Sequence, residues 1–181
     1  MKMKSGFSAL MLIALLSLPA YAKHASFSER VIFHQGEDGV NTYRIPALIE
    51  TVKGTLIAVV DARRDSSRDL PAHISLVMRR SFNGGKDWEP MRTIVAVEEG
   101  GVGDASLLLD RSNGRVWYFH SYGPPGIGFH TAKPGARTGA TTFQFHAMYS
   151  DDDGATWSSP VDLPPQVKEP QWQAMFAASG T

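Results

Sequence analysis

Two eight-residue stretches, 69 positions apart, decide how this chain folds: Ser81-Phe82-Asn83-Gly84-Gly85-Lys86-Asp87-Trp88 and Ser150-Asp151-Asp152-Asp153-Gly154-Ala155-Thr156-Trp157. Both have Ser first, Asn or Asp third, Gly fifth, Asp or Thr seventh and Trp eighth. A short amide or carboxylate can bind backbone N–H groups, the glycine can take a positive φ, and the tryptophan can pack beneath. Each stretch is therefore predicted to be a folded turn that follows a strand.

The sequence around these turns is typical of short antiparallel strands. Phe143–Tyr149 alternates apolar and polar residues with a period of two, which indicates a half-buried strand. Asn113-Gly114 lies between two apolar runs and predicts a tight hairpin. No helix is indicated after the first 22 residues, so the chain is predicted to be an all-β meander. The other apolar runs, each bounded by turn residues, are Leu56–Val60, Ile74–Met78, Leu107–Leu109 and Val116–Phe119.

The composition excludes several classes of protein. The 181 residues include 18 Lys+Arg and 18 Asp+Glu, without the basic excess typical of a nucleic-acid-binding protein. The absence of cysteine excludes disulfide scaffolds, Cys-ligated zinc, iron–sulfur clusters and thiol nucleophiles. A hydrophobic content of 43% is ordinary for a globular chain and too high for a disordered one.

The first 22 residues have the organisation of a signal peptide. Lys2 and Lys4 form a positive n-region, Phe7–Leu18 is apolar, and Ala20-Tyr21-Ala22 fits a cleavage site. The apolar stretch is shorter than the roughly 20 residues that a membrane span needs. We expect residues 23–181 to be exported to the periplasm, the cell surface or the medium, with no membrane span.

The acidic run Asp151–Asp153 raises the alternative of a calcium loop. An EF-hand loop would need an oxygen ligand at its fifth position and a bidentate Glu at its twelfth. Counted from Asp151, those positions hold Ala155 and Asp162, so a structural turn is the better interpretation. The histidines at 73, 120, 130 and 146 have no metal-ligand spacing. No metal and no cofactor are predicted.

Three segments carry charged groups at the ends of predicted strands: Tyr43–Pro46, Asp61–Pro71 and Gly103–Ser106. The guanidinium fork of arginine can bind a planar carboxylate through two hydrogen bonds. An aspartate on a neighbouring loop can donate a proton. These residues also fit the alternative that they are solvated charges in loops, which sequence spacing by itself leaves open.

Taken in order, these motifs resemble a secreted bacterial sialidase. The two turns match the Asp-box repeat of β-propellers, and Tyr43-Arg44-Ile45-Pro46 precedes an arginine that lies five residues before Asp69. The resemblance runs over essentially all of residues 23–181 and implies a six-bladed β-propeller, of which the chain would supply roughly the first three blades. The first Asp box departs from the repeat at Asn83 and Asp87.

The resemblance implies a role for each matching residue. Arg44 is the first arginine of the triad that binds the substrate carboxylate, Arg64 is the second substrate-binding arginine, and Asp69 is the general acid and base. Asp104 is a pocket carboxylate near the glycerol or 4-hydroxyl side of the sugar. Arg63 and Asp65 compete with Arg64 and Asp69 for these roles, because they lie in the same loop.

The activity that the resemblance implies is retaining hydrolysis of terminal α-linked sialic acids. In that family a tyrosine activated by a glutamate is the nucleophile, because the carboxylate at the anomeric carbon repels an anionic one. The tyrosine, the glutamate and the third arginine are expected beyond Thr181. The expected partners are sialylated glycans, with no obligate protein partner.

Two questions stay open. A non-catalytic sialic-acid-binding propeller, or an enzyme for a related 2-keto sugar, would carry similar motifs. Trp172 and Phe176 could form an apolar wall for the N-acetyl group of the sugar, or could pack in the core.

Overall fold

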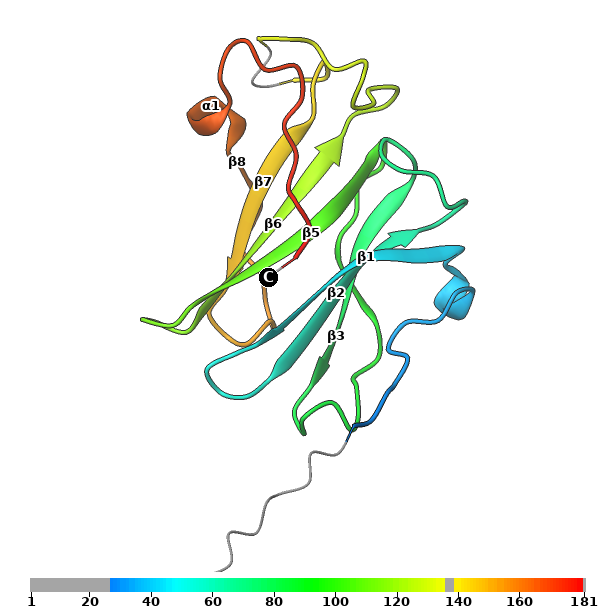
Figure 1. Cartoon of the computed structure of the whole chain (residues 1–181), viewed down its shortest axis with the longest axis vertical. Helices are drawn as coiled ribbons and strands as arrows, with labels where there is room; N and C mark the ends of the chain where they lie inside the picture. Colours follow the sequence, from blue (N-terminus) through cyan, green and yellow to red (C-terminus); the bar gives the residue numbers. More distant parts are fainter. Residues whose placement is uncertain (1–26, 136–138, 181) are drawn as a thin grey trace, which may run out of the picture. The chain divides into compact units, whose positions relative to one another are not determined.

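The computed structural model describes residues 27–135 and 139–180, and residues from Val31 onward pack as one unit. The predicted signal peptide lies outside the described residues. Two four-stranded antiparallel sheets form the unit, in the orders β1-β2-β3-β4 and β5-β6-β7-β8 (Figure 1). We call them blade 1 and blade 2. Their strands are β1 (Thr42–Glu50), β2 (Leu56–Arg63), β3 (Ile74–Ser81), β4 (Arg92–Val95), β5 (Gly101–Asp110), β6 (Arg115–Gly123), β7 (Gln144–Ser150) and β8 (Val161–Asp162).

The all-β prediction is confirmed, and β2, β3, β5, β6 and β7 lie where the apolar runs placed them. The helical structure of the described residues consists only of a 3₁₀ turn, Glu37–Gly39, and one α-helical turn, α1 (Pro164–Val167). The Asn113-Gly114 hairpin joins β5 to β6, with Asp110 opposite Arg115. The described part of the chain contains no helix long and apolar enough to cross a membrane.

β2 is buried along almost its whole length because both of its faces are covered. Ile57 and Val59 pack against blade 2, in a core that includes Val116 and Tyr118. On the other face, Val60 and its neighbours form a second cluster with Val40. A strand covered on both faces reads as a continuous apolar run, which explains the unbroken hydrophobic stretch Leu56–Val60.

The two blades repeat one pairing register. In blade 1, Ile57, Val59 and Asp61 of β2 face Arg80, Met78 and Leu76 of β3. In blade 2, Trp117, Phe119 and Ser121 of β6 face Tyr149, Ala147 and Phe145 of β7. Stacked, equivalent four-stranded meanders are the architecture of a β-propeller, here a partial one.

The first strand of each blade is bulged at the same level. Ile45 and Pro46 lie opposite the single residue Val60, and Asp104 and Ala105 lie opposite His120. Ile45 and Asp104 have positive φ angles of 57° and 60°. A bulge of this kind bends the strand and re-aims its side chains. Both bulges lie in the segments that the sequence singled out for their charged residues.

The two Asp boxes form the predicted turns. Ser150 Oγ accepts the N–H of Gly154 at 2.8 Å, and Asp152 accepts the N–H and the hydroxyl of Thr156 at 2.8 and 2.6 Å. In the first box, Ser81 Oγ accepts the N–H of Gly85 at 2.9 Å.

The first box compensates for its departure from the repeat. The Asn83 amide donates to the Asp87 carboxylate at 2.8 Å, while Asn83 Oδ1 accepts the Asp87 N–H at 2.9 Å. In the second box the donor is the seventh residue, Thr156, and the acceptor is the third, Asp152. The direction of the side-chain hydrogen bond is therefore reversed, and both boxes keep one.

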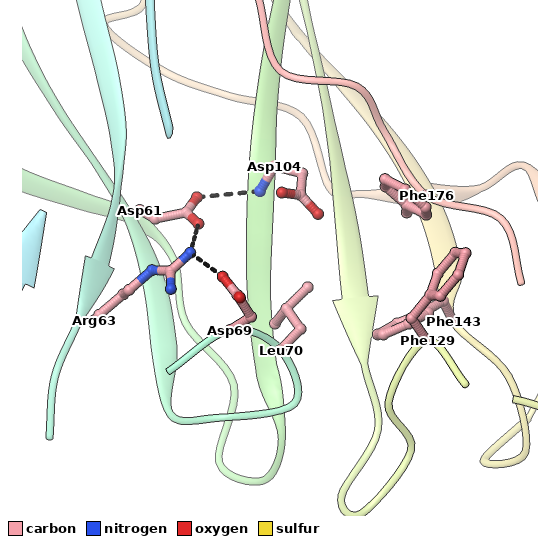
Figure 2. A pocket seen from close by; sticks show the side chains of 8 residues that line it. All are labelled: Asp61, Arg63, Asp69, Leu70, Asp104, Phe129, Phe143 and Phe176. Carbon is pink, nitrogen blue, oxygen red and sulfur yellow. Dashed lines mark hydrogen bonds and ion pairs between the residues drawn. The ribbon is translucent and has the colours of Figure 1, made fainter. Parts of the chain in front are cut away.

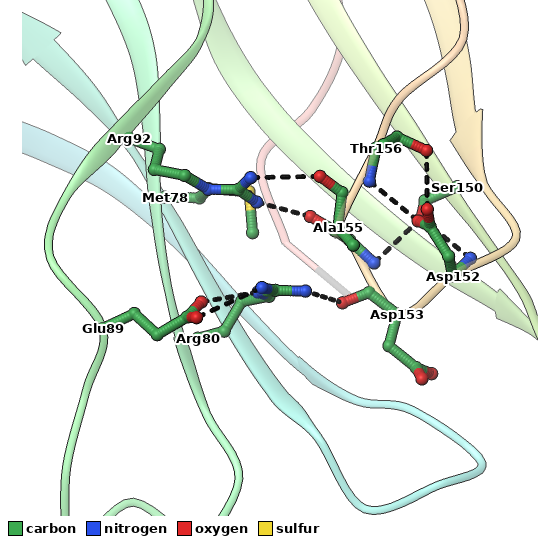
Figure 3. A network of polar contacts seen from close by, with 10 residues as sticks. Met78, Arg80, Glu89, Arg92, Ser150, Asp152, Asp153, Ala155 and Thr156 are labelled. Carbon is green, nitrogen blue, oxygen red and sulfur yellow. Dashed lines mark hydrogen bonds and ion pairs between the residues drawn. The ribbon is translucent and has the colours of Figure 1, made fainter.

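The second Asp box also joins the blades. Arg92 donates to the main-chain carbonyls of Gly154 and Ala155 at 2.6 and 3.0 Å, and Arg80 donates to that of Asp153 at 3.3 Å (Figure 3). Glu89 holds Arg80 through two hydrogen bonds, at 2.7 and 3.2 Å. Blade 1 thus satisfies three carbonyls of the blade 2 turn.

The described residues contain two complete blades where the sequence suggested about three. The long connection 124–143 between β6 and β7 uses much of the chain. After α1, the chain returns along β5, where the main chain of Gly180 exchanges hydrogen bonds with Ala105 and Leu107.

Candidate functional site

A pocket of about 230 Å³ opens where charged residues of both blades meet an apolar wall (Figure 2). The charged side comes from β2, from β5 and from the loop that follows β2. The apolar side is formed by Leu70 and by three phenylalanines from the connection 124–143 and the C-terminal segment. The lining residues are Asp61, Arg63, Asp69, Leu70, Asp104, Phe129, Phe143 and Phe176.

Arg63, the last residue of β2, is the cation in this lining, and only 2% of it is exposed. Its Nη2 lies 2.6 Å from Asp69 Oδ1, and its Nη1 donates to the carbonyl of Ser67 at 2.7 Å. These contacts fold the loop 64–73 back over the end of β2. The arginine therefore fixes the position of Asp69.

Asp69 lies between two guanidinium groups. Arg44, from β1, approaches the same Oδ1 atom, with its Nη1 at 3.6 Å. The Asp69 side chain is 77% exposed and that of Arg44 is 50% exposed, so both are open to a ligand. An exposed carboxyl group beside a half-exposed arginine can donate a proton when it is protonated, while the arginine binds an anion.

A pair of carboxyl groups, those of Asp61 and Asp104, lies deeper in the pocket. Asp61 is 1% exposed, and its Oδ1 accepts the N–H of Asp104 at 3.1 Å. Burial, reinforced by the neighbouring Asp104 carboxylate, raises the pKa of Asp61 to about 8. Burial also raises the pKa of Asp104. Gly103 permits this approach, because a Cβ at that position would lie 3.0 Å from Asp61 Oδ2.

The structure brings Asp69 and Asp104 into one pocket and places Arg44 beside Asp69, outside the lining itself. It separates Arg64 from all three. Arg64 donates to Ser75 Oγ at 2.8 Å and to Thr93 Oγ1 at 3.3 Å, and it does not line the pocket. Successive side chains along an extended strand point to opposite faces, so only one of the two adjacent arginines can reach the pocket. That arginine is Arg63, which differs from the preference for Arg64 drawn from sequence spacing.

The other competing residue, Asp65, also lies outside the pocket lining. Its Oδ2 is 3.1 Å from His73 Nδ1, at the rim of the loop. Of the two aromatic residues considered for an apolar wall, Phe176 lines the pocket and Trp172 does not.

Sequence reasoning assigned no role to Asp61, Phe129 or Phe143. The alternation of β2 carries a signal for Asp61, because residues two apart share a face and Arg63 follows two positions later. Phe129 lies in a connection without periodicity and contacts Phe176 edge to face, with ring centroids 5.5 Å apart. No local pattern in the sequence identifies that contact. Among the described residues no cluster of three or more His, Cys, Asp or Glu side chains is arranged to hold a metal ion.

Comparison with known proteins places this site in context. The chain matches no protein-family profile. It is 38% identical over 158 residues to a sialidase of Bacteroides fragilis and 33% identical over 159 residues to a sialidase of Micromonospora viridifaciens. These alignments cover 81% and 85% of the chain but only 29% and 24% of the two relatives. The chain thus spans less than a third of either relative.

Solved structures agree with the fold. The Hadza microbial sialidase Hz136 superimposes with a TM-score of 0.73 at 34% identity, covering 81% of this chain and 31% of that one. A leech intramolecular trans-sialidase has a TM-score of 0.74 at 16% identity, covering 87% of this chain and 40% of that one, and supports the fold alone.

The fold and its two Asp boxes define part of an Asp-box β-propeller. Within that class, the chain is homologous to sialidases over about four-fifths of its length.

Proposed function

We propose that the protein carrying this chain is an exo-α-sialidase, a retaining glycoside hydrolase that removes terminal α-linked sialic acids from glycoproteins, glycolipids and oligosaccharides. One observation carries the proposal. Guanidinium groups from β1 and β2, those of Arg44 and Arg63, converge on the exposed carboxylate of Asp69 at the mouth of a pocket that is half charged and half apolar.

Sialic acid matches the chemistry of both sides of this pocket. Its carboxylate would be bound by Arg44, whose 3.6 Å contact with Asp69 is longer than a hydrogen bond and leaves donors for a planar anion. Its hydroxyl groups would meet Arg63 and Asp104. The methyl of its N-acetyl group would pack against the apolar wall that includes Phe176.

Asp69 would act on the glycosidic bond. It protonates the departing oxygen in the first step and activates water in the second. Its exposure suits this role, because the leaving group of an exo-acting enzyme extends into solvent. The contact with Arg63 keeps the Asp69 carboxylate in place whichever leaving group the substrate carries.

Export belongs to the same proposal. The n-region, apolar stretch and cleavage motif of residues 1–22 support it. Cell fractionation, with sequencing of the mature N-terminus, tests it. Cleavage after Ala22 is the expected result.

The activity is tested on the purified gene product that carries this chain, with sialyllactose as the substrate. Free sialic acid should be released, and Arg44→Ala should reduce the rate. Tight binding of sialyllactose without release would indicate the lectin instead. Neither binding nor release would overturn the proposal.

A further inference from the structure

Asp61 connects the two halves of the charged wall. Through Oδ1 it accepts the N–H of Asp104, on blade 2, at 3.1 Å. Its Oδ2 lies 3.8 Å from Arg63 Nη2, on blade 1. The side chain itself lines the pocket, as Figure 2 shows, yet it is almost completely buried. It touches two groups assigned above to the sugar and leaves little of itself exposed.

The equivalent position in blade 2 shows what a purely structural residue does there. Ser121 matches Asp61 in the repeated register, and its Oγ accepts the N–H of Ala177 at 2.8 Å. In both blades, therefore, a side chain of the second strand accepts one backbone N–H from a later segment. A neutral hydroxyl suffices for this bond in blade 2. Accepting this N–H therefore does not by itself require the carboxyl group of Asp61.

The groups around Asp61 define what the carboxyl adds. Arg63 of β2 and Asp104 of β5 are its charged neighbours, and Arg44 lies opposite it in the ladder with β1. Burial, with a further contribution from Asp61, raises the pKa of Tyr118 on β6. Asp69 lies 2.6 Å and Asp61 3.8 Å from the fully buried Arg63, and the third carboxyl group, that of Asp104, lines the same pocket. Two adjacent carboxylates in a buried site cannot both ionise cheaply. The most buried of the three, Asp61, is the one that favours the neutral acid.

We propose that Asp61 is a positioning residue of the sialic-acid site, holding Asp104 in place as a neutral acid beside Arg63, and that its ionisation sets the alkaline limit of substrate binding. This inference rests on the proposed function. When Asp61 loses its proton, a second negative charge competes for Arg63 and repels Asp104. The two groups that bind the sugar hydroxyls, Arg63 and Asp104, are then disturbed. The carboxylate of the substrate meets a more negative wall.

The test compares Asp61→Asn with Asp61→Ala in the gene product that carries this chain, by the pH dependence of kcat/KM on sialyllactose. Asparagine keeps an acceptor for the Asp104 N–H and cannot ionise. Measured relative to its own kcat/KM at pH 6, its alkaline limb should move up by about one pH unit or more compared with that of the unmodified protein. Alanine leaves the Asp104 N–H unpaired, and KM should rise about tenfold at every pH.

Asp162→Asn is the matched control, because Asp162 is a partly buried carboxyl group of β8 that does not line the pocket. It should leave the pH profile unchanged. An active protein whose Asp61→Asn variant keeps the original alkaline limb would overturn the role of Asp61 while leaving the sialidase proposal standing. A gene product that neither binds nor hydrolyses sialyllactose would overturn both.

Carboxyl ¹³C NMR tests the same inference without turnover. The resonance missing in Asp61→Asn should titrate with a midpoint near the pKa of about 8. In Asp104→Asn that midpoint should fall, because the repelling charge is gone. A midpoint near that of an ordinary aspartate would overturn the inference whether or not the protein hydrolyses sialosides.

Discussion

Arg92 donates through Nη2 to the main-chain carbonyl of Gly154 at 2.6 Å, and this bond fastens the second Asp box to blade 1. The approach is close because Gly154 has no side chain. A Cβ there would lie 3.0 Å from Ile57 Cδ1 and 3.2 Å from Met78 Cε. An Asp box is thus a contact between blades as well as a turn within one.

Arg92→Ala should therefore lower the free energy of unfolding. It leaves the carbonyls of Gly154 and Ala155 without these donors, at a cost of about 1–2 kcal/mol. Urea denaturation followed by tryptophan fluorescence measures the loss. Arg111→Ala, in the exposed β5–β6 hairpin, is the control and should change stability by less than about 0.5 kcal/mol. Equal effects of the two variants would show that the Arg92 hydrogen bonds do not stabilise the contact between the second Asp box and blade 1.

The reversed hydrogen bond of the first Asp box gives a double-mutant prediction. Asn83→Asp should destabilise the chain by about 1 kcal/mol, because it replaces the 2.8 Å donor to Asp87 with a second carboxylate. Adding Asp87→Thr recreates the arrangement of the second box and should recover most of the loss. The coupling free energy from urea denaturation is the readout. Additive effects would show that the two side chains act independently.

Asp69 and Arg44 should respond differently to the leaving group. Asp69→Ala removes proton donation, typically a factor of about 10²–10⁴, and a nitrophenolate leaving group needs little of it. Its loss in kcat/KM should therefore be much larger with sialyllactose than with a nitrophenyl sialoside. Arg44→Ala should reduce both alike, since the carboxylate it binds is common to the two. If Asp69→Ala costs the same on both substrates, the acid is another residue.

The adjacent arginines offer a matched pair. Arg63→Lys keeps the charge but loses the fork that contacts both Asp69 and Ser67, and it should reduce kcat/KM about tenfold or more. Arg64→Lys disturbs only the contacts with Ser75 and Thr93, outside the pocket, and should change kcat/KM less than about threefold. Circular dichroism verifies the fold of both. The opposite ranking would assign the second substrate-binding arginine to Arg64.

His120 should make stability depend on acid pH. Burial, with a smaller contribution from His146, lowers the pKa of His120 from 6.5 to about 3. The unfolded chain then binds the extra proton first, so stability is lost as the pH falls from about 6.5 toward 3, by up to about 1.4 kcal/mol per pH unit.

His120→Phe removes the side chain that binds this proton, so it should make the free energy of unfolding depend less on pH. Urea midpoints at pH 7 and pH 4.5 measure it, and the exposed His130→Phe is the control. A steep acid slope that survives in His120→Phe would assign it to other groups.

The strands and the Asp boxes could be predicted from the sequence because their determinants are local. Period-two alternation, Asn113-Gly114 and the serine–aspartate–glycine spacing each act within a few residues. The charged segments that hold Arg44, Asp69 and Asp104 could be singled out in the same way, because each lies next to a recognisable strand, whereas the roles expected of these residues came from the resemblance to sialidases. For these features the local sequence is sufficient.

Only the tertiary structure decided which side of β2 faces the pocket. Alternation states that Arg63 and Arg64 point to opposite faces, but not which face blade 2 covers. Packing of the two blades settles that choice in favour of Arg63, and it turns Asp61, two residues earlier, toward Asp104 across the blade boundary. Phe129 and Phe176 meet for the same reason: their contact joins segments far apart in the chain, and no local pattern records it.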